Sequence, residues 1–294
     1  MKVHMKFSFI IPVKDEEETI LDVLNTIPTY LKSDDKYSFF VMSDSTDNTD
    51  IIASSEKNTK VIDCQNIGLG YSVFRGIKEA AKENPDYLFI IDGDGQTDLS
   101  DISKFISYSK KYANVDIFIS SRFKEKNLIQ YNYPFINLLG TKILKTIINL
   151  STNYKVTDSH GGIRLFKNKV AKKILLIGDH TYVQEFLIDS KRKNFTVMEL
   201  ASKWHIRKHG KSKVVGSIIK YIFNVFPILF IRLDLHKKIF YSLGLFLFLI
   251  LLISSKFLNL VEFISITILA FLMFLIGYVL ESIKNLIIYL KIKK

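Results

Sequence analysis

Two long apolar runs near the C-terminus constrain the fold of this chain more than any other feature. Residues 239–255 form an uncharged run of 17 residues, and residues 263–280 form another of 18. A helix needs roughly 20 apolar residues to cross the hydrocarbon core, and slightly fewer where its ends carry snorkelling lysines. The short connection between the runs predicts a hairpin of two transmembrane helices. Two buried helices of a soluble core are the alternative, which the lack of any polar stripe disfavours.

Positive charge around the two runs predicts the orientation of the hairpin. Lysines flank the hairpin on both sides, and one lies between its runs: Lys237, Lys238, Lys284, Lys291, Lys293 and Lys294 outside, and Lys256 between. Cytoplasmic loops carry the excess of basic residues, so we expect both flanks in the cytoplasm. The apolar stretch at the N-terminus is too short for a secretory signal. The sequence therefore predicts an integral membrane protein with both termini and its large N-terminal part in the cytoplasm.

Two further segments, residues 134–150 and 214–231, have amphipathic patterns. In the first, polar residues recur at every fourth position, at Asn137, Thr141, Lys145 and Asn149. The second is more apolar and contains Pro227, a predicted break, and its residues 218–231 are too interrupted for a third span. We expect both to form helices at the membrane surface, although packing on a soluble core is an alternative.

The charge and the cysteine content exclude several classes of protein. The formal net charge is +12. Basic residues in the membrane-facing segments would meet anionic lipid headgroups, and no interleaved aromatic and basic motif predicts nucleic-acid binding. A single cysteine, Cys64, excludes an intrachain disulfide and a cysteine-rich zinc site.

The first 125 residues alternate β-rich runs with helical patterns. We expect strands at 7–13, 37–42, 60–63, 87–91 and 115–120, and helices near 16–32, 48–56, 70–83 and 100–112. This alternation predicts βαβ units and a mostly parallel sheet covered on both faces. Ligands of such sheets bind at the loops that follow the carboxyl ends of the strands.

The loop after the fourth predicted strand carries the strongest chemical signal. Asp92, Asp94 and Gln96 alternate there with glycines and place oxygen atoms together, which hard divalent cations prefer. An EF-hand loop would need glycine at Thr97 and glutamate at Ser103, and it would follow a helix. An acidic turn without a ligand is the remaining alternative.

The other three loops are polar but less specific. Residues 14–18 and 43–49 are rich in acids and capping residues, which are also typical of ordinary helix starts. The third loop contains Gly68 and Gly70, whose lack of a side chain lets another group approach the backbone. The third glycine of a dinucleotide fingerprint is absent, since position 73 is valine. A nicotinamide-dinucleotide site is therefore disfavoured.

Taken in order, these motifs resemble those of family-2 glycosyltransferases of GT-A fold. The motifs are IIPVKDEEETI, SDSTDNTD, NIGLGYSVFRGIKEA, FIIDGDGQTD, SSRF, TDSHGGIRLF and IRKHGKSK. The likeness is greatest to dolichol-phosphate mannose synthases and bacterial polyprenyl-phosphate glycosyltransferases, and it covers about residues 6–213. It implies a GT-A domain over residues 1–213, an interfacial helix over 214–234 and a hairpin with a basic tail over 235–294.

The resemblance also implies roles for individual residues. The nucleotide-binding candidates are Pro12, Asp15, Glu16, Asp44, Gly68, Gly70 and Asp92. The ligands of Mg²⁺ or Mn²⁺ would be Asp92, Asp94 and Gln96. The phosphate or acceptor candidates are Arg122, Arg164, Arg207, Ser212 and Lys213, and the catalytic candidates are Asp94, Arg122, Asp158 and Glu185.

The family pattern is not matched throughout. Ser159, His160 and Gly161 stand where Pro-Thr-Ser is common, which indicates a different acceptor pocket. His205 and His209 lie in a basic loop without a third ligand at a metal-site spacing, so we expect phosphate contacts or solvent exposure for them.

The implied reaction transfers a sugar, with inversion, from a nucleoside diphosphate sugar to a polyprenyl phosphate in the bilayer, and related members can assemble into oligomers. A phosphate dianion is already a nucleophile, because its second pKa is near 6. In one alternative the acceptor is a hydroxyl of a lipid-linked glycan or cell-surface polymer, and Asp158 or Glu185 is a general base. A non-catalytic membrane protein that binds nucleotide is a second alternative.

Overall fold

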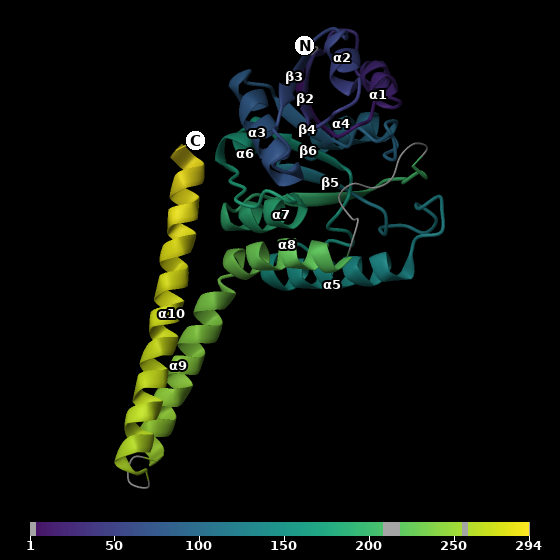
Figure 1. Ribbon diagram of the computed structural model, residues 1–294. Helices are drawn as coiled ribbons and strands as arrows, with labels where there is room; N and C mark the ends of the chain where they lie inside the picture. The colour runs from purple at the N-terminus through teal and green to yellow at the C-terminus, as the bar shows by residue number, and fades with distance from the viewer. Residues whose placement is uncertain (1–3, 208–217, 255–257, 294) are drawn as a thin grey trace. The chain divides into compact units, whose positions relative to one another are not determined.

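The computed structural model describes residues 4–207, 218–254 and 258–293 of the chain (Figure 1). These residues divide into two compact units, Met1–Ile222 and Phe223–Lys294. The expected domain boundary at residues 213 and 214 lies outside the described residues.

The first unit contains a seven-stranded mixed sheet in the order β3-β2-β1-β4-β6-β5-β7. The strands are β1 (Lys6–Val13), β2 (Lys36–Ser43), β3 (Thr59–Asp63), β4 (Tyr87–Ile91), β5 (Ile117–Ser121), β6 (Ile163–Lys167) and β7 (Val197–Ala201). The first four strands are parallel, as expected from the βαβ pattern. Strand β6 lies antiparallel between β4 and β5, so the sheet is mostly parallel and mixed.

Helices connect the strands of this unit and cover both faces of the sheet. They are α1 (Ile20–Thr26), the 3-10 helix η1 (Ile27–Tyr30), α2 (Thr49–Ser54), α3 (Leu69–Lys82), α4 (Asp101–Lys111), α5 (Phe135–Thr152), α6 (Asn168–Lys173) and α7 (Val183–Arg192). The predicted helix over 16–32 forms only from Ile20 and ends as the 3-10 turn, which has Pro28 near its start. Proline is tolerated there because the first turn of a helix leaves its N–H groups unpaired.

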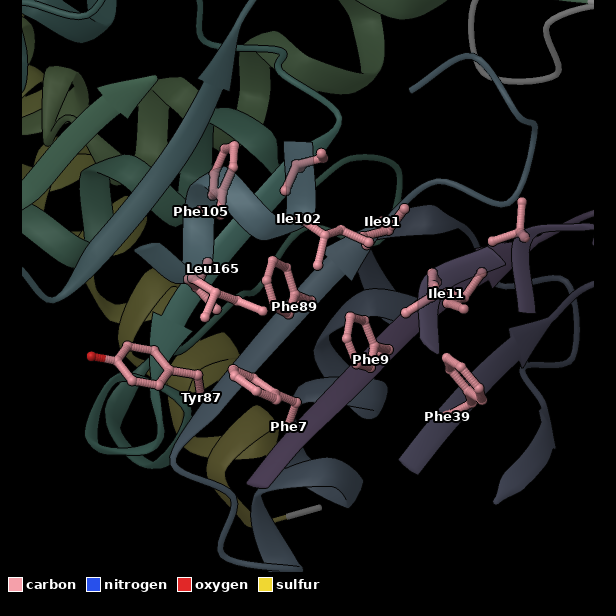
Figure 2. Packing of buried hydrophobic residues seen from close by; sticks show 14 of the residues in the cluster. Phe7, Phe9, Ile11, Phe39, Tyr87, Phe89, Ile91, Ile102, Phe105 and Leu165 are labelled. Carbon is pink, nitrogen blue, oxygen red and sulfur yellow. The ribbon is translucent and has the colours of Figure 1, made fainter. Parts of the chain in front are cut away.

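The core on one face of the sheet is built from aromatic side chains of the central strands. Phe9 and Phe89 stack with ring centroids 4.9 Å apart, and Ile102 and Phe105 of α4 pack against the same cluster (Figure 2). Each fully buried side chain of this size contributes about 1.5–3 kcal/mol through the hydrophobic effect. On the opposite face α3 lies so close that a Cβ at Gly76 would be 2.6 Å from Ile10. Burial on both faces explains why these strands are continuously apolar.

Helix α5 presents its apolar side to solvent. Its most exposed apolar residues include Phe135, Ile143 and Leu150, of which Phe135 has 77% of its surface exposed. Thr141, on the side expected to be polar, is buried, and the Asn149 side chain bonds the backbone of Val156 at 2.8 and 2.9 Å. The helix therefore packs through its polar side and leaves an apolar face unpacked.

Helix α8 (Ile218–Arg232) begins in one unit and ends in the other, and it continues through Pro227. The expectation that Pro227 breaks this helix was wrong. Proline lacks one backbone donor, and this helix accommodates the loss without ending.

The second unit contains two long apolar helices, α9 (Leu235–Ser254) and α10 (Leu260–Lys293), which pack side by side (Figure 1). Both are long and apolar enough to cross a membrane, and few of their side chains are buried within the structure. The contact is close because Gly244 faces the Phe274 ring and Gly277 faces the Tyr241 ring. Small residues allow such an approach between membrane helices.

A cluster of charged residues joins the two helices at the start of α9. His236 Nε2 lies 2.9 Å from Glu281 Oε2, and Lys284 Nζ lies 2.7 Å from Asp234 Oδ1 and 3.0 Å from Glu281. Lys237 adds a contact of 3.0 Å to Glu281. The carboxylates of this cluster form ion pairs with lysines, which is the usual arrangement for charges that are partly buried.

Candidate active site

Carboxylates from two loops meet at one guanidinium at the carboxyl edge of the sheet. Arg207 donates from one terminal nitrogen to Glu16 Oε1 at 2.7 Å and to Asp94 Oδ2 at 3.0 Å. Glu16 follows β1, Asp94 follows β4, and these two strands are neighbours in the sheet. The sheet topology therefore brings together the first and the fourth predicted loops. We call Glu16, Asp92 and Asp94 the carboxylate centre.

The loop that carries Asp94 is held in place on two sides. Gly95 adopts φ +69°, a conformation that favours glycine, and the Gln96 N–H then donates to Asp94 Oδ1 at 3.1 Å. The Thr19 hydroxyl donates to the carbonyl of Gly93 at 2.8 Å. The side chain of Gln96 donates to the carbonyl of His205 at 3.2 Å, so its role as a metal ligand stays a prediction.

The segment around Trp204 lies along this loop and positions Arg207. Thr97 and Trp204 form an antiparallel bridge, and the His205 N–H donates to the carbonyl of Gln96 at 2.8 Å. The His205 ring lies 3.5 Å from the Asp98 carboxylate. The start of the predicted basic loop thus contacts the loop that carries Asp94 through backbone hydrogen bonds. Ser212, Lys213 and His209 lie outside the described residues.

The Asp92 carboxyl of this centre has a strongly perturbed pKa. Burial, and then the charge of the neighbouring Asp94, raise the pKa of Asp92 to about 7. The positive charges of Arg164 and Arg207 oppose this shift. Two acids that disfavour each other's charge in a buried place are typical of a site completed by a cation.

Arg164 lies fully buried beneath this centre. Its guanidinium donates to the carbonyls of Ser159 and Val183 at 3.0 and 3.3 Å, and lies 4.8 Å from the Tyr182 ring centroid. The Phe186 ring lies 5.4 Å away on α7. Burial lowers the pKa of Arg164, partly offset by Tyr182 and Asp92. Its contact with an acceptor phosphate stays a prediction.

Arg122 and Asp158 form a buried two-point ion pair. Arg122 Nε lies 2.7 Å from Asp158 Oδ2, and a terminal nitrogen lies 3.0 Å from Oδ1. The N–H of His160 also donates to Oδ1, at 2.8 Å. Burial alone would raise the pKa of the Asp158 carboxyl, but the Arg122 guanidinium outweighs it and holds that pKa below its usual range. Asp158 is therefore an ionised, fully engaged carboxylate.

Aromatic rings surround the Arg122 side of this pair. The guanidinium carbon lies 5.1 Å from the Trp204 ring centroid, 5.4 Å from that of Phe123 and 5.5 Å from that of Tyr133. These distances are within the range of cation–π attraction. The rings leave Arg122 only 7% exposed, and its predicted phosphate contact stays a prediction.

The carboxylates of Glu185 and Glu199 both accept hydrogen bonds from backbone amides. The Glu185 carboxylate accepts from Ile177 N at 2.7 Å and Gly178 N at 2.9 Å. Glu199, on β7, accepts from the N–H groups of Thr157 and Asp158 at 2.8 and 2.9 Å. Carboxylates used in this way fix loop conformation. The catalytic role expected of Glu185 stays a prediction.

Acids of the first two loops bind the loops that follow them in the sequence. Asp15 Oδ1 accepts from Thr46 N at 2.7 Å, and Asp44 accepts from Asn66 N at 2.7 Å and from the Ser72 hydroxyl at 3.0 Å. Pro12 is buried within β1. The structure thus gathers these residues at one edge of the sheet, while their nucleotide contacts stay predictions.

Gly68 and Gly70 allow another group to approach the backbone closely, and here that group is another segment of the same chain. A Cβ at Gly68 would lie 2.5 Å from the carbonyl oxygen of Asp179, and one at Gly70 would lie 2.3 Å from that of Gly178. The N–H of Gly70 donates to the carbonyl of Asp179 at 2.7 Å. The glycines therefore dock the loop before α7 onto the start of α3.

Several residues of this region lack a sequence signal. The residues concerned are Tyr133, Tyr182, Gln184, Glu199 and Trp204. Each acts through a contact that is distant in sequence, such as Gln184 Nε2 with His160 Nε2 at 2.7 Å. In the sequence, the departure from the family pattern at Ser159–Gly161 was the only indication of any of these contacts, that of Gln184 with His160.

The donor set fits a divalent cation. Asp94 and Glu16 already converge on a positively charged group, and their oxygens are the hard ligands that Mg²⁺ and Mn²⁺ prefer. Burial and the charge of Asp94 raise the pKa of Asp92 despite the nearby arginines, so the ionised carboxylate would gain from a further positive charge. A cation at this point would supply that charge.

The mixed sheet and its covering helices have the GT-A fold. The structure resembles the crystal structure of glucosyl-3-phosphoglycerate synthase from Mycobacterium tuberculosis in complex with Mn²⁺, UDP and glucosyl-3-phosphoglycerate. The TM-score is 0.57 at 15% identity, over 78% of this chain and 80% of the other. At this identity the likeness establishes the fold alone.

The sequence comparisons then give the family. Residues 8–175, more than half of the chain, match the family model of Glycosyl transferase family 2, and the chain belongs to this family of glycosyltransferases. It is similar to the uncharacterized protein MJ1222 of Methanocaldococcus jannaschii, with 32% identity over 69% of this chain and 83% of that one. It is also similar to the dolichol-phosphate mannosyltransferase of Pyrococcus furiosus, with 30% identity over 76% of this chain and 64% of that one.

Proposed function

We propose that the protein transfers a sugar, with inversion, from a nucleoside diphosphate sugar to a polyprenyl phosphate at the cytoplasmic face of a membrane. The observation that carries this proposal is the carboxylate centre of Glu16, Asp92 and Asp94 in a chain with two membrane-type helices. Its similarity to a dolichol-phosphate mannosyltransferase supports the acceptor class.

The carboxylate centre would hold Mg²⁺ or Mn²⁺ against the donor diphosphate. The bound ion would stabilise negative charge on the leaving nucleoside diphosphate. Asp94 and Asp92 would hold it, with Gln96 beside them, and Arg207 is close enough to contact the same phosphates. Asp15 and Asp44 shape the loops on which the nucleoside would rest.

The state of Asp158 and Glu185 favours a phosphate acceptor over a hydroxyl acceptor. A hydroxyl needs a general base, but Asp158 is held ionised in a two-point ion pair. The Glu185 carboxylate accepts from two backbone amides. A polyprenyl monophosphate is largely dianionic at neutral pH and needs no base. We therefore give Asp158 the role of orienting Arg122 and expect neither Asp158 nor Glu185 to act as a general base.

The apolar face of α5 supports an acceptor that remains in the bilayer. Phe135, Ile143 and Leu150 expose large apolar surfaces on one helix, and an amphipathic helix of this kind inserts into the headgroup region. A long polyprenyl chain cannot leave the lipid, so the catalytic domain must work at the membrane surface.

The test is a panel of donors on detergent-purified protein. UDP-glucose, UDP-N-acetylglucosamine and GDP-mannose, each radiolabelled, are incubated with Mn²⁺ and a polyprenyl phosphate, and the lipid is extracted. We expect label in the lipid with at least one donor, lost on chelation of the metal. Label in a lipid-linked glycan of added membranes, with none in the polyprenyl phosphate, would instead establish a hydroxyl acceptor.

A further inference from the structure

Arg207 occupies the position between the two loops where a cation is needed. One terminal nitrogen of its guanidinium contacts both Glu16 and Asp94, at 2.7 and 3.0 Å. The side chains are largely buried, with 15%, 9% and 17% exposed for Arg207, Glu16 and Asp94. A single positive group therefore joins carboxylates from two strands, as a bound metal ion would.

The guanidinium and a divalent cation compete for the same oxygen atoms. The guanidinium contacts Asp94 Oδ2, and a divalent cation held by the Asp94 carboxylate would lie close enough to repel it strongly. A divalent ion that arrives alone must displace Arg207 from two charged hydrogen bonds. A nucleoside diphosphate changes this balance, because its phosphate oxygens accept from a guanidinium in a two-point geometry.

The backbone two residues before Arg207 is anchored, so we infer that the exchange proceeds by rotation of the Arg207 side chain. Trp204 is bridged to Thr97, and the His205 N–H donates to Gln96, which holds the segment along the metal-type loop. An arginine side chain spans several rotatable bonds. The same residue can thus turn from the carboxylates to a diphosphate that lies over them.

We propose that Arg207 is the resident counter-cation of the carboxylate centre and couples metal binding to nucleotide binding. Mn²⁺ then binds weakly alone and tightly together with a nucleoside diphosphate, whose phosphates receive the displaced guanidinium. Arg207 is a positioning residue in this scheme, and the inference rests on the proposed function because it requires a metal–nucleotide donor.

The test measures Mn²⁺ binding by electron paramagnetic resonance on the full chain in detergent, without and with UDP or GDP. We expect wild-type protein to bind Mn²⁺ at least roughly tenfold more tightly with one of these nucleotides. Arg207→Met should bind Mn²⁺ alone roughly tenfold more tightly than wild type and gain less from the nucleotide. Arg207→Lys keeps the charge and should restore most of the coupling.

Two controls make the result specific. Lys203→Ala removes a positive charge from an exposed position of the same segment and should behave as wild type. Asp94→Ala should lose Mn²⁺ binding with and without nucleotide. Equal Mn²⁺ affinity of wild type and Arg207→Met, or an equal gain from nucleotide in both, would overturn the inference while leaving the proposed function intact. Absence of nucleotide-dependent Mn²⁺ binding in every variant would overturn both.

Discussion

At the scale of single residues, the site is built from charges that only partly cancel. Burial, and then the charge of Asp94, raise the pKa of Asp92, and the guanidinium of Arg207 opposes this shift. The pair of Arg122 and Asp158 is instead complete, with two contacts of 2.7 and 3.0 Å. The carboxylate centre, whose charges are not balanced, is therefore the expected place for a ligand, whereas the balanced pair of Arg122 and Asp158 belongs to the scaffold.

Replacing Asp94 tests the metal site by its chemistry. Asp94→Ala removes a carboxylate that would hold the cation, so we expect the turnover number to fall about 10²–10³-fold. The measurement is steady-state transfer at saturating donor and Mn²⁺. Asp34→Ala changes an exposed acid at the other end of the sheet and should retain full activity. A near-normal turnover of Asp94→Ala would contradict the assignment.

The buried His160 makes the free energy of unfolding depend on pH in a defined direction. Burial lowers the pKa of this imidazole to about 4, whereas a histidine in the unfolded chain titrates near 6.5. Between these values the unfolded chain binds more protons, so the free energy of unfolding decreases as the pH falls from about 7 towards 4. His160→Gln cannot take up this proton, and we expect a flatter pH dependence from it.

Thermal unfolding in detergent between pH 7.5 and 5 measures this effect. The exposed His4 is the matched control, because His4→Gln should leave the slope of the wild-type protein unchanged. Identical slopes for His160→Gln and wild type would show that His160 is not buried as a neutral group.

At the scale of elements, the exposed apolar face of helix α5 is the surface that we propose inserts into the membrane. Replacing Leu139 and Ile143 by glutamate places charges on its exposed apolar face. We expect the KM for polyprenyl phosphate to rise roughly tenfold or more and the KM for the donor to stay constant, because a charge on this face weakens insertion into the headgroups.

The control for this prediction lies on the same helix. Ser151 is exposed and polar and lies about 120° around the helix axis from Leu139, so Ser151→Glu adds one charge away from the apolar face and should leave both KM values unchanged. An equal rise of the acceptor KM in both variants would point to net charge rather than to the apolar face.

Most elements of the fold follow from local sequence patterns, and the site follows only in part. The strands of the sheet's parallel half and the amphipathic α5 were predicted, because apolar runs and four-residue periodicity are local signals. The antiparallel insertion of β6 was not predicted, since strand order depends on contacts distant in sequence. For the same reason the partners of Asp158 and Glu185 emerged only from the structure.

At the scale of the whole molecule, the lysine distribution predicts that both ends of the α9–α10 hairpin are cytoplasmic. Cysteine labelling tests this with little background, because Cys64 is fully buried and burial raises the pKa of its thiol to about 11. Asn259→Cys, between the two helices, should react with a membrane-impermeant maleimide in intact cells. Lys126→Cys, exposed on the catalytic domain, should react only after permeabilisation.

The reverse labelling pattern would place the catalytic domain outside the cytoplasm. Labelling of both cysteines in intact cells would contradict the hairpin itself.

Product analysis with two acceptors that share one tail tests the central claim most directly. Purified protein, Mn²⁺ and the active donor are incubated with a polyprenyl monophosphate or with the corresponding polyprenol. The masses and yields of the lipid products are then measured by mass spectrometry. We predict one added sugar on the phosphate and none on the alcohol, with about 10²–10³-fold less product from Asp94→Ala in the same time. A sugar on the alcohol, or an equal yield of product from Asp94→Ala, would contradict metal-assisted transfer to a phosphate nucleophile.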